Sequence, residues 1–376
     1  SPRFPPELEH TVRKEIEMHL EALDARIGYS SAACGADLLF IEAMQDREAE
    51  VNIVLPFAME DFIETSVAHA GRKWIARFRR AMQVAHSVKY VTEERFLGDE
   101  LLFRFAGQIF HGYADLRARA LDTVPHLLAV WDGDPTIRVG GTADIVNRWL
   151  DPDRLHVIRL PATDTAATLA EEGSAPPQYH RLIRTMLFAD VVGYSTLPEN
   201  YLPVYIHDFL VRVSHELAQL PHRPLFVNTW GDALFAVMDE ATGLIEYAFA
   251  LHNAVAHANA ALPELPKLLE VRVALHAGPV YADVDPFTGK ENFYGAHVNR
   301  AARIEPVTLP GHIYASEQFV ALLTVEQIAI RQKARQAGQP ALYPFICEYV
   351  GVLALAKNFG PQVVYHVRKR AAAEAG

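Results

Sequence analysis

The chain has 376 residues, of which 50% are hydrophobic and 22% are charged, so it can bury a sizeable core in more than one domain. Its formal net charge of −11 argues against a general nucleic-acid-binding protein, which usually presents a basic face. We find no apolar run long enough for a membrane and no signal-peptide pattern. The two cysteines, Cys34 and Cys347, lie far apart, which predicts a cytoplasmic protein without disulfide framework or zinc site.

Residues 1–160 alternate strand-like and helical patterns. The strand-like runs are residues 26–30, 51–56, 87–91, 126–131 and 155–160, and a long helical pattern surrounds residues 74–85. Alternation of this kind predicts an α/β domain of the Rossmann-like class, with a parallel sheet and helices on both faces.

Two turns rich in small residues follow strands of this first domain, SSAACGAD at residues 30–37 and WDGDPTIRVGGTAD at residues 131–144. Helix N-termini at such strand ends could hold phosphate or a small nucleotide-like ligand. The alternative is that these turns need glycine only for their backbone geometry. Cys34 has no evident histidine partner, so we expect a regulatory domain rather than a second enzyme. The layout with GGTAD is similar to nucleotide-sensing domains of the SLOG type.

The stretch from residue 161 to 178, PATDTAATLAEEGSAPPQ, lacks apolar periodicity and predicts a linker before a second domain at residues 179–370. Strand patterns follow at residues 185–192, 225–229, 233–238, 271–276 and 312–315, with helical patterns at 205–220, 241–260 and 297–305. The order β-α-β-β-α-β is typical of a ferredoxin-like or palm-type α+β domain.

Two acidic residues of this second domain are candidate metal ligands. Asp190 in LFADVVGYS and Asp232 in NTWGDALFAV each follow or precede strand-like residues beside a tight turn. Carboxylates on neighbouring strand ends can hold a pair of divalent cations. The alternative is structural, with Asp190 capping the next helix and Asp232 serving as a turn residue.

Three motifs occur in one order: LFADVVGYS, the hairpin NTWGDALFAV, and FYGAHVNRAARIE; a weaker fourth is LAKNFGPQVVYHV. Together they resemble the catalytic domain of class III nucleotidyl cyclases, over about residues 184–367. The resemblance implies that Asp190, Asp232 and the backbone carbonyl of Val191 bind two Mg²⁺ or Mn²⁺ ions per active site. It also implies a head-to-tail dimer with sites at the seam. Since this chain carries both halves of the site, we expect an active homodimer.

The same resemblance assigns three further residues. Asn299 and Arg303 match the family's transition-state pair, in which Asn299 orients the ribose and Arg303 stabilises charge on the α-phosphate. They are four residues apart and so share one helix face, which could instead be a solvated face. Lys357 falls near the lysine that contacts the terminal phosphates, although a solvated surface lysine is the alternative.

Base selection is where the chain departs from the family. Asn228 and Asn292 stand where adenylate cyclases usually have Lys and Asp, and guanylate cyclases Glu and Cys. A carboxamide offers an acceptor and two donors, which suit several base edges, including uracil. The resemblance therefore implies an NTP cyclase that releases pyrophosphate. We lean towards UTP and cUMP, as in family members that signal against phage, and keep a cAMP-forming adenylate cyclase and a catalytically dead nucleotide sensor as alternatives.

Overall fold

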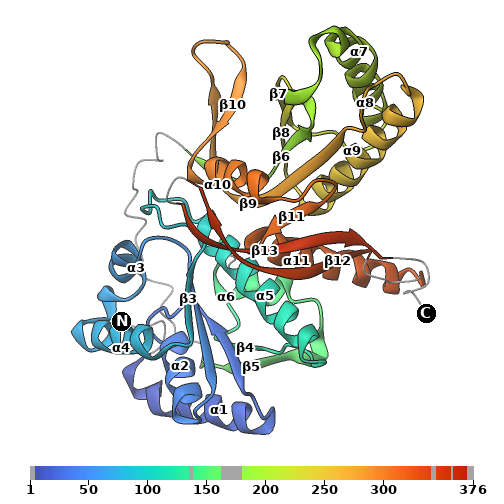
Figure 1. Ribbon diagram of the computed structural model, residues 1–376. Coiled ribbons are helices and arrows are strands. Elements are labelled where there is room, and N and C mark those ends of the chain that lie inside the picture. Colours follow the sequence, from blue (N-terminus) through green and yellow to red (C-terminus); the bar gives the residue numbers. More distant parts are fainter. Residues whose placement is uncertain (1–4, 135–138, 162–179, 340–343, 357–358, 371–376) are drawn as a thin grey trace. The chain divides into compact units, whose positions relative to one another are not determined.

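The protein is described here from a computed structural model that covers residues 5–134, 139–161, 180–339, 344–356 and 359–370. The chain forms two compact units, Ser1–His180 and Arg181–Gly376 (Figure 1). Residues 162–178 of the expected linker lie outside the described part. Along that part, no helix combines the length and apolar character needed to cross a bilayer.

The first unit contains two parallel sheets. Strands β1 (Ile27–Ser30), β2 (Glu50–Leu55) and β3 (Ser87–Tyr90) form one sheet in that order, and β4 (Leu127–Trp131) pairs with β5 (Leu155–Arg159) in the other. The expected strands and their parallel direction are therefore present. The expectation of a single sheet is wrong, since the structure divides these strands between two sheets.

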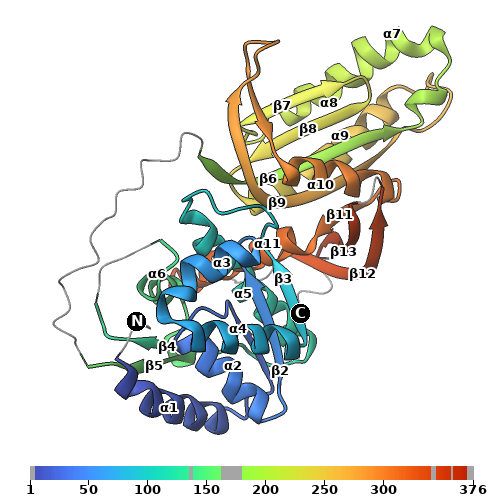
Figure 2. The same ribbon diagram turned by 90° about the vertical axis from the view of Figure 1, so that its left-hand side faces the viewer.

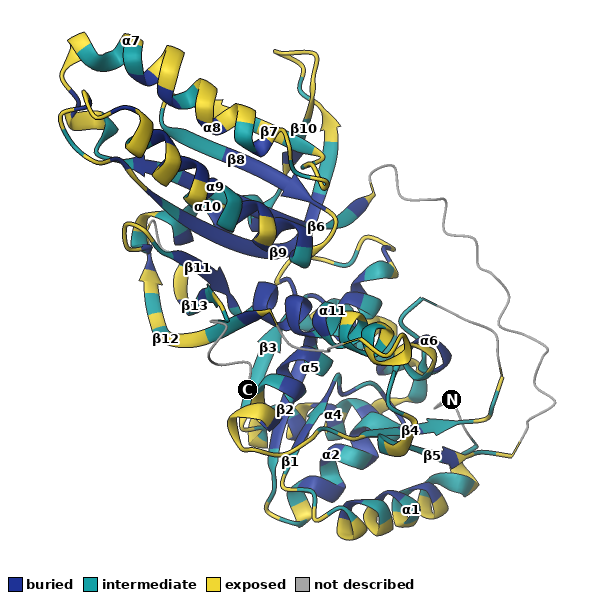
Figure 3. Cartoon of the chain, turned by 90° about the vertical axis from the view of Figure 1, so that its right-hand side faces the viewer, coloured by how far each residue is buried: buried dark blue, intermediate teal, exposed yellow. Residues whose placement is uncertain are grey.

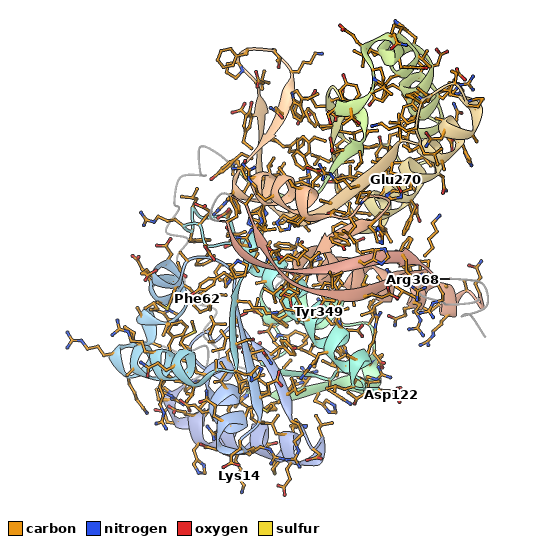
Figure 4. The ribbon with its side chains drawn as sticks, viewed as in Figure 1. Lys14, Phe62, Asp122, Glu270, Tyr349 and Arg368 are labelled. Carbon is orange, nitrogen blue, oxygen red and sulfur yellow. The ribbon has the colours of Figure 1, made fainter. Side chains whose placement is uncertain are left out.

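Six helices of the first unit supply most of its core. They are α1 (Glu9–Ala22), α2 (Ala36–Asp46), α3 (Met59–Ser66), α4 (Arg72–Val84), α5 (Leu101–Ala120) and α6 (Thr142–Arg148). Phe62 of α3, labelled in Figure 4, packs against the rings of Phe57 and Phe78. Helix α4 buries Trp74 and Phe78 and exposes four of its five basic residues, as its 3.6-residue periodicity predicts. The fifth, Arg77, is partly buried in ion pairs with Glu9 and Glu42.

The second unit is built on one large sheet. Its strands are β6 (Arg181–Val192), β7 (Phe226–Trp230), β8 (Ala233–Met238), β9 (Glu270–Val284), β10 (Glu291–Tyr294), β11 (Ile313–Ser316), β12 (Phe345–Leu355) and β13 (Gly360–Lys369). The order is β12-β13-β11-β9-β6-β8-β7, with β10 paired to β9. Because β6 runs antiparallel to both β8 and β9, the first four strands have the ferredoxin-like order expected for a palm-type domain.

The helices of this unit are α7 (Leu202–Val204), α8 (Leu210–Leu217), α9 (Ala241–Ala261), α10 (Ala296–Ile304) and α11 (Glu317–Gln336). Two details differ from the sequence-based expectation. Residues Tyr205–Phe209 form a π-helical turn where a regular helix was expected. Strand β9 continues to Val284, so that β9 and β10 form a hairpin that projects from the sheet (Figure 2).

Both faces of the sheet are buried. Met186 of β6 and Val280 of β9 pack against Ala301 of α10 in one apolar cluster. Leu187 and Leu275 alternate with such positions, point to the other face and have no exposed surface. Strands β8, β9 and β11 have the largest share of buried residues in the unit. Figure 3 shows β8 and β9 largely in the colour of buried residues, which explains their long apolar runs.

Candidate active site

The two predicted metal-binding acids lie on neighbouring strands. Asp190 is near the end of β6 and pairs with Ala233 of β8. Asp232 occupies the turn from β7 to β8, and its carbonyl oxygen accepts a hydrogen bond of 3.2 Å from the Val191 N–H. Gly231 before it has a φ of 65°, a conformation that favours glycine. The strand register therefore brings Asp190 and Asp232 side by side.

The electrostatics of this pair are those of crowded carboxylates. Burial, together with the negative charge of Asp190, raises the pKa of Asp232, while Arg272 acts in the opposite direction. Arg272, directly opposite Asp190 on β9, donates from Nη2 to Asp190 Oδ2 at 2.8 Å. Its Nε also forms an ion pair with Glu305. Burial raises the pKa of Glu305, and the charges of Asp190 and Asp232 raise it further, while Arg272 lowers it. Three acids thus surround one guanidinium.

Sequence reasoning missed Arg272 and Glu305. A signal was present for the first of them, because Arg272 interrupts the apolar strand pattern between the buried residues Val271 and Val273. A charged residue inside a buried strand needs a partner. Which partner it has depends on the register between β6 and β9, and this long-range pairing cannot be read from the local sequence.

Two tyrosines line the same turn. The rings of Tyr194 and Tyr205 lie 4.7 Å apart, and Tyr205 also stacks on Phe209 at 5.4 Å. A Cβ atom placed on Gly231 would lie 3.8 Å from the Tyr194 ring. Tyr194 therefore packs over the turn that carries Asp232, and Tyr205 extends this aromatic wall into the core.

The donor set around the acid pair fits a divalent cation. Asp190 and Asp232 provide carboxylate oxygens, and Val191 follows Asp190 with a backbone carbonyl, the kind of hard ligands that Mg²⁺ and Mn²⁺ prefer. Mutual repulsion between the acids is relieved by a cation between them. Over the described residues, no group of three or more His, Cys, Asp or Glu side chains is arranged around a common ion position. Any such site would therefore use two side chains and the backbone.

The predicted transition-state pair is carried by a helix, α10. Asn299 and Arg303 are both on α10, where Asn299 is exposed and the Arg303 Nε is buried without a hydrogen-bond partner. Among the described residues, no hydrogen bond or ion pair joins either of them to Asp190 or Asp232. His297 faces the sheet, and Asn299 two positions later points away from it. Within the described part of one protomer, the two predicted pairs are therefore not joined by hydrogen bonds or ion pairs.

Helix α10 is fixed to the sheet through a buried histidine pair that sequence reasoning also missed. His276 Nε2 of β9 lies 2.9 Å from His297 Nδ1, and His276 Nδ1 lies 2.7 Å from the Ser316 hydroxyl. Burial, reinforced by nearby arginine, lowers the pKa of His297 to about 3 and that of His276 well below its ordinary value. Both rings are therefore neutral donors and acceptors that hold the helix in place.

The remaining predicted residues are less defined by contacts. Asn228 on β7 is half-buried, and its Oδ1 accepts from the Thr229 N–H at 3.0 Å. Asn292 on β10 is half-buried as well, and its Oδ1 accepts from the Phe293 N–H at 2.9 Å. They belong to two different hairpins of the protomer. Lys357 lies outside the described residues.

In the first unit, one expectation is wrong. Cys34 does have a histidine neighbour, because its Sγ lies 3.3 Å from His69 Nε2. His69 is exposed in a short 3₁₀ turn, Ala68–Ala70, that follows α3. The two residues are 35 positions apart in sequence and meet because the chain folds back over the end of β1, so the sequence alone gave no sign of the contact.

The GGTAD turn is held by hydrogen bonds to Asp144 within the first unit. Against the effect of burial, hydrogen bonds from the Gly140 N–H, Arg104 and Arg148 lower the pKa of Asp144 to about 2. Gly140 has a φ of 72°, and a Cβ on it would lie 2.5 Å from the Arg104 backbone nitrogen. These contacts favour the view that the glycine serves backbone geometry, and a ligand of this unit stays a prediction.

Comparison with known proteins identifies the second unit. Residues 178–338 match the sequence profile of the family described as the adenylate and guanylate cyclase catalytic domain. The second unit therefore contains a catalytic domain of the class III nucleotidyl cyclases, in agreement with the motifs and the palm-type fold.

Among the relatives, guanylyl cyclase C of Sus scrofa is 29% identical over 185 residues, covering 46% of this chain and 17% of that protein. A putative adenylate cyclase 3 of Rhizobium meliloti is 31% identical over 147 residues, covering 38% of this chain and 24% of that protein. The chain thus spans less than a quarter of the length of these curated relatives.

Two solved structures are similar to about half of the chain. The adenylyl cyclase CyaB from P. aeruginosa has a TM-score of 0.41 at 16% identity, covering 51% of this chain and 96% of that chain. The guanylate cyclase domain of RhGC from Catenaria anguillulae, solved in complex with GTP, has a TM-score of 0.39 at 18% identity, covering 50% of this chain and 97% of that chain.

Proposed function

We propose that the second unit converts a nucleoside triphosphate into a 3′,5′-cyclic nucleotide and pyrophosphate, in a homodimer of this chain. The observation that carries the proposal is the pair of adjacent carboxylates, Asp190 and Asp232, inside a cyclase catalytic domain. Their crowding disfavours the folded protein by itself, so the arrangement is best explained by a bound cation.

The metal ligands would be the carboxylates of Asp190 and Asp232 and the carbonyl of Val191, holding two Mg²⁺ or Mn²⁺ ions. Such ions, when bound, acidify the ribose 3′-hydroxyl and neutralise charge on the triphosphate. Arg272 is held beside the carboxylates by its ion pairs with Asp190 and Glu305, where its charge offsets part of theirs. Lys357 is proposed as a cationic contact to the terminal phosphates.

The partner protomer would complete each site with Asn299 and Arg303. Both are displayed on α10 without contact to the acid pair of their own protomer, as a shared site requires. Asn299 would orient the ribose, and Arg303 would stabilise the charge that develops on the α-phosphate. Loss of such a fixed donor costs about 3 to 4 kcal/mol, so Arg303→Ala should lower kcat by roughly 100- to 1000-fold.

The base that is accepted is a finer question. The relatives are described as guanylyl and adenylate cyclases, which supports a purine nucleotide. The second candidate is UTP, with cUMP as an anti-phage signal, and the neutral carboxamides of Asn228 and Asn292 favour it because they match neither purine-selecting pair. If these residues select the base, Asn228→Lys combined with Asn292→Asp should raise kcat/KM for ATP relative to the other NTPs by at least about 10-fold.

The direct experiment is incubation of the full chain with each NTP and Mn²⁺, with the product identified by mass spectrometry. Formation of any cyclic nucleotide excludes the dead-sensor alternative. Asp190→Asn is the matched control, since it removes the charge and keeps the shape. Absence of product from all four NTPs, or full activity of Asp190→Asn, would refute the proposal.

A mixing experiment tests the shared site. Asp190→Asn and Arg303→Ala should each be inactive, yet mixed protomers should form heterodimers with one intact site. Random pairing makes half of the dimers mixed, and each has one of two sites, so about a quarter of the wild-type activity should return. If mixing restores nothing while both variants dimerise, each site belongs to a single protomer.

A further inference from the structure

Tyr205 stands out among the residues that the proposed mechanism does not use. It is the first residue of the π-helical turn Tyr205–Phe209 and has 1% of its surface exposed. Its ring lies 4.7 Å from that of Tyr194 and 5.4 Å from that of Phe209. Single π-helical turns inside helices occur frequently at functional sites, because the extra residue redirects the side chains around it.

The hydroxyl of this tyrosine is the unusual feature. It is buried and has no hydrogen-bond partner among the described residues. A buried donor without an acceptor destabilises a folded protein, and such groups in native structures call for an explanation. The surrounding aromatic rings cannot supply an acceptor of normal strength, so the reason for this unpaired hydroxyl must be sought in the polar groups near it.

The acid pair is near enough to act on this hydroxyl electrostatically. Burial raises the pKa of Tyr205, and the negative charges of Asp232 and, more weakly, Asp190 add to this effect. Independently of that, Tyr205 packs on Tyr194, and Tyr194 packs over Gly231, next to Asp232. The hydroxyl is therefore protonated, buried and within electrostatic reach of two carboxylates, without being bonded to either.

We propose that Tyr205 is a positioning residue of the metal site, which donates its hydroxyl proton to a carboxylate oxygen of Asp232 when a divalent cation occupies the acid pair. A hydrogen bond from outside the ligand shell fixes the orientation of a ligating carboxylate and raises the affinity for the metal. The inference rests on the proposed function of the acid pair. It adds a residue that touches neither substrate nor metal and acts through Asp232.

The test is Tyr205→Phe, which removes one oxygen and keeps the ring contacts with Tyr194. Its matched control is Tyr247→Phe, because Tyr247 of α9 is also buried and burial alone raises its pKa. Mn²⁺ affinity is measured by the EPR signal of free Mn²⁺, and thermal unfolding is recorded in EDTA. Neither readout depends on turnover.

We expect Tyr205→Phe to bind Mn²⁺ about 10-fold more weakly than the wild type. In EDTA it should unfold at the same or a higher temperature, because a buried unpaired hydroxyl has been removed. Tyr247→Phe should leave the affinity for Mn²⁺ unchanged. This combination separates a positioning role from a structural one, which would lower the unfolding temperature in EDTA and leave the affinity intact.

Equal Mn²⁺ affinity of the wild type and Tyr205→Phe would overturn the inference while leaving the proposed cyclase in place. A wild type that binds no Mn²⁺ would overturn both. A wild type that binds Mn²⁺ but yields no cyclic nucleotide would refute the proposed function, and the 10-fold loss in Tyr205→Phe would still establish the role of the hydroxyl.

Discussion

Gly278 of β9 lies directly beneath His297, on the helix that carries the predicted transition-state pair, and leaves no room for a side chain. An alanine Cβ at this position would lie 2.2 Å from His297 Nδ1 and 2.5 Å from its Cγ. Ordinary contact begins near 3.4 Å, so the His297 ring would have to retreat by about 1.2 Å. The atom that is met, Nδ1, is also the one that bonds to His276.

The magnitude of Gly278→Ala follows from these two effects. Overpacking a core costs about 1 to 3 kcal/mol. Separating the buried imidazoles leaves polar nitrogens unpaired, which costs about 1 to 3 kcal/mol more. Replacing glycine reduces the backbone entropy that is lost on folding, which offsets at most about 1 kcal/mol of this destabilisation. We therefore expect a loss of roughly 3 kcal/mol, which lowers the unfolding temperature of a unit of this size by about 6 to 12 °C.

The assay is thermal unfolding of the full chain by circular dichroism, with two comparisons. Gly243→Ala in α9 is the matched control, because its Cβ would meet only the flexible end of Met238, at 3.1 Å. Its unfolding temperature should change little or rise. The second comparison repeats Gly278→Ala in a His297→Ala background, where the obstructing ring is gone and the loss should fall below about 1 kcal/mol. Equal losses in both backgrounds would refute the steric argument.

Two further outcomes are expected. The pKa of Asp144 in the folded protein is about 2, below its ordinary value of 3.8, so its stabilisation is present above pH 4 and is lost as pH falls through 2. Urea unfolding should therefore show Asp144→Asn less stable than the wild type by about 2 kcal/mol at pH 6 and by about half as much at pH 3. Asp232→Asn should raise the unfolding temperature in EDTA, because the raised pKa of Asp232 marks a charge that the fold disfavours. The same variant should lose the stabilisation that Mn²⁺ gives to the wild type. An Asp232→Asn variant that is less stable than the wild type in EDTA would contradict the electrostatic argument.

The sequence was most informative where periodicity and short motifs act locally. Apolar patterns located the strands of the first unit and β6, β7, β8, β9 and β11 of the second, but not β10, β12 or β13. The β-α-β-β-α-β order gave the palm-type fold before any contact was known. The two acids were predicted as candidate metal ligands because each lies beside a turn that the motif defines. Features of this kind depend on the preferences of a few adjacent residues, and these preferences survive in the folded chain.

What the sequence missed depends on pairing between distant segments. Arg272 and Asp190 are 82 residues apart, and only the register of β6 with β9 brings them within 2.8 Å. His276 and His297 would each pass for an ordinary polar residue until β9 and α10 are packed together. The division of the first unit into two sheets was invisible for the same reason, since local patterns identify strands but not their neighbours.

The acid pair combines features that local sequence patterns explain with features that depend on long-range packing. Local rules account well for β6, β8 and the glycine turn, yet those elements converge on an arrangement that the fold alone does not favour: two adjacent carboxylates, one shared guanidinium and a buried hydroxyl without a partner. A sequence selected for stability alone would remove at least one of these conflicts, as Asp232→Asn or Tyr205→Phe would do. Their coincidence around the turn from β7 to β8 supports the proposal of a ligand of opposite charge, because a bound divalent cation would satisfy the carboxylates and would give the hydroxyl an oriented acceptor at the same time.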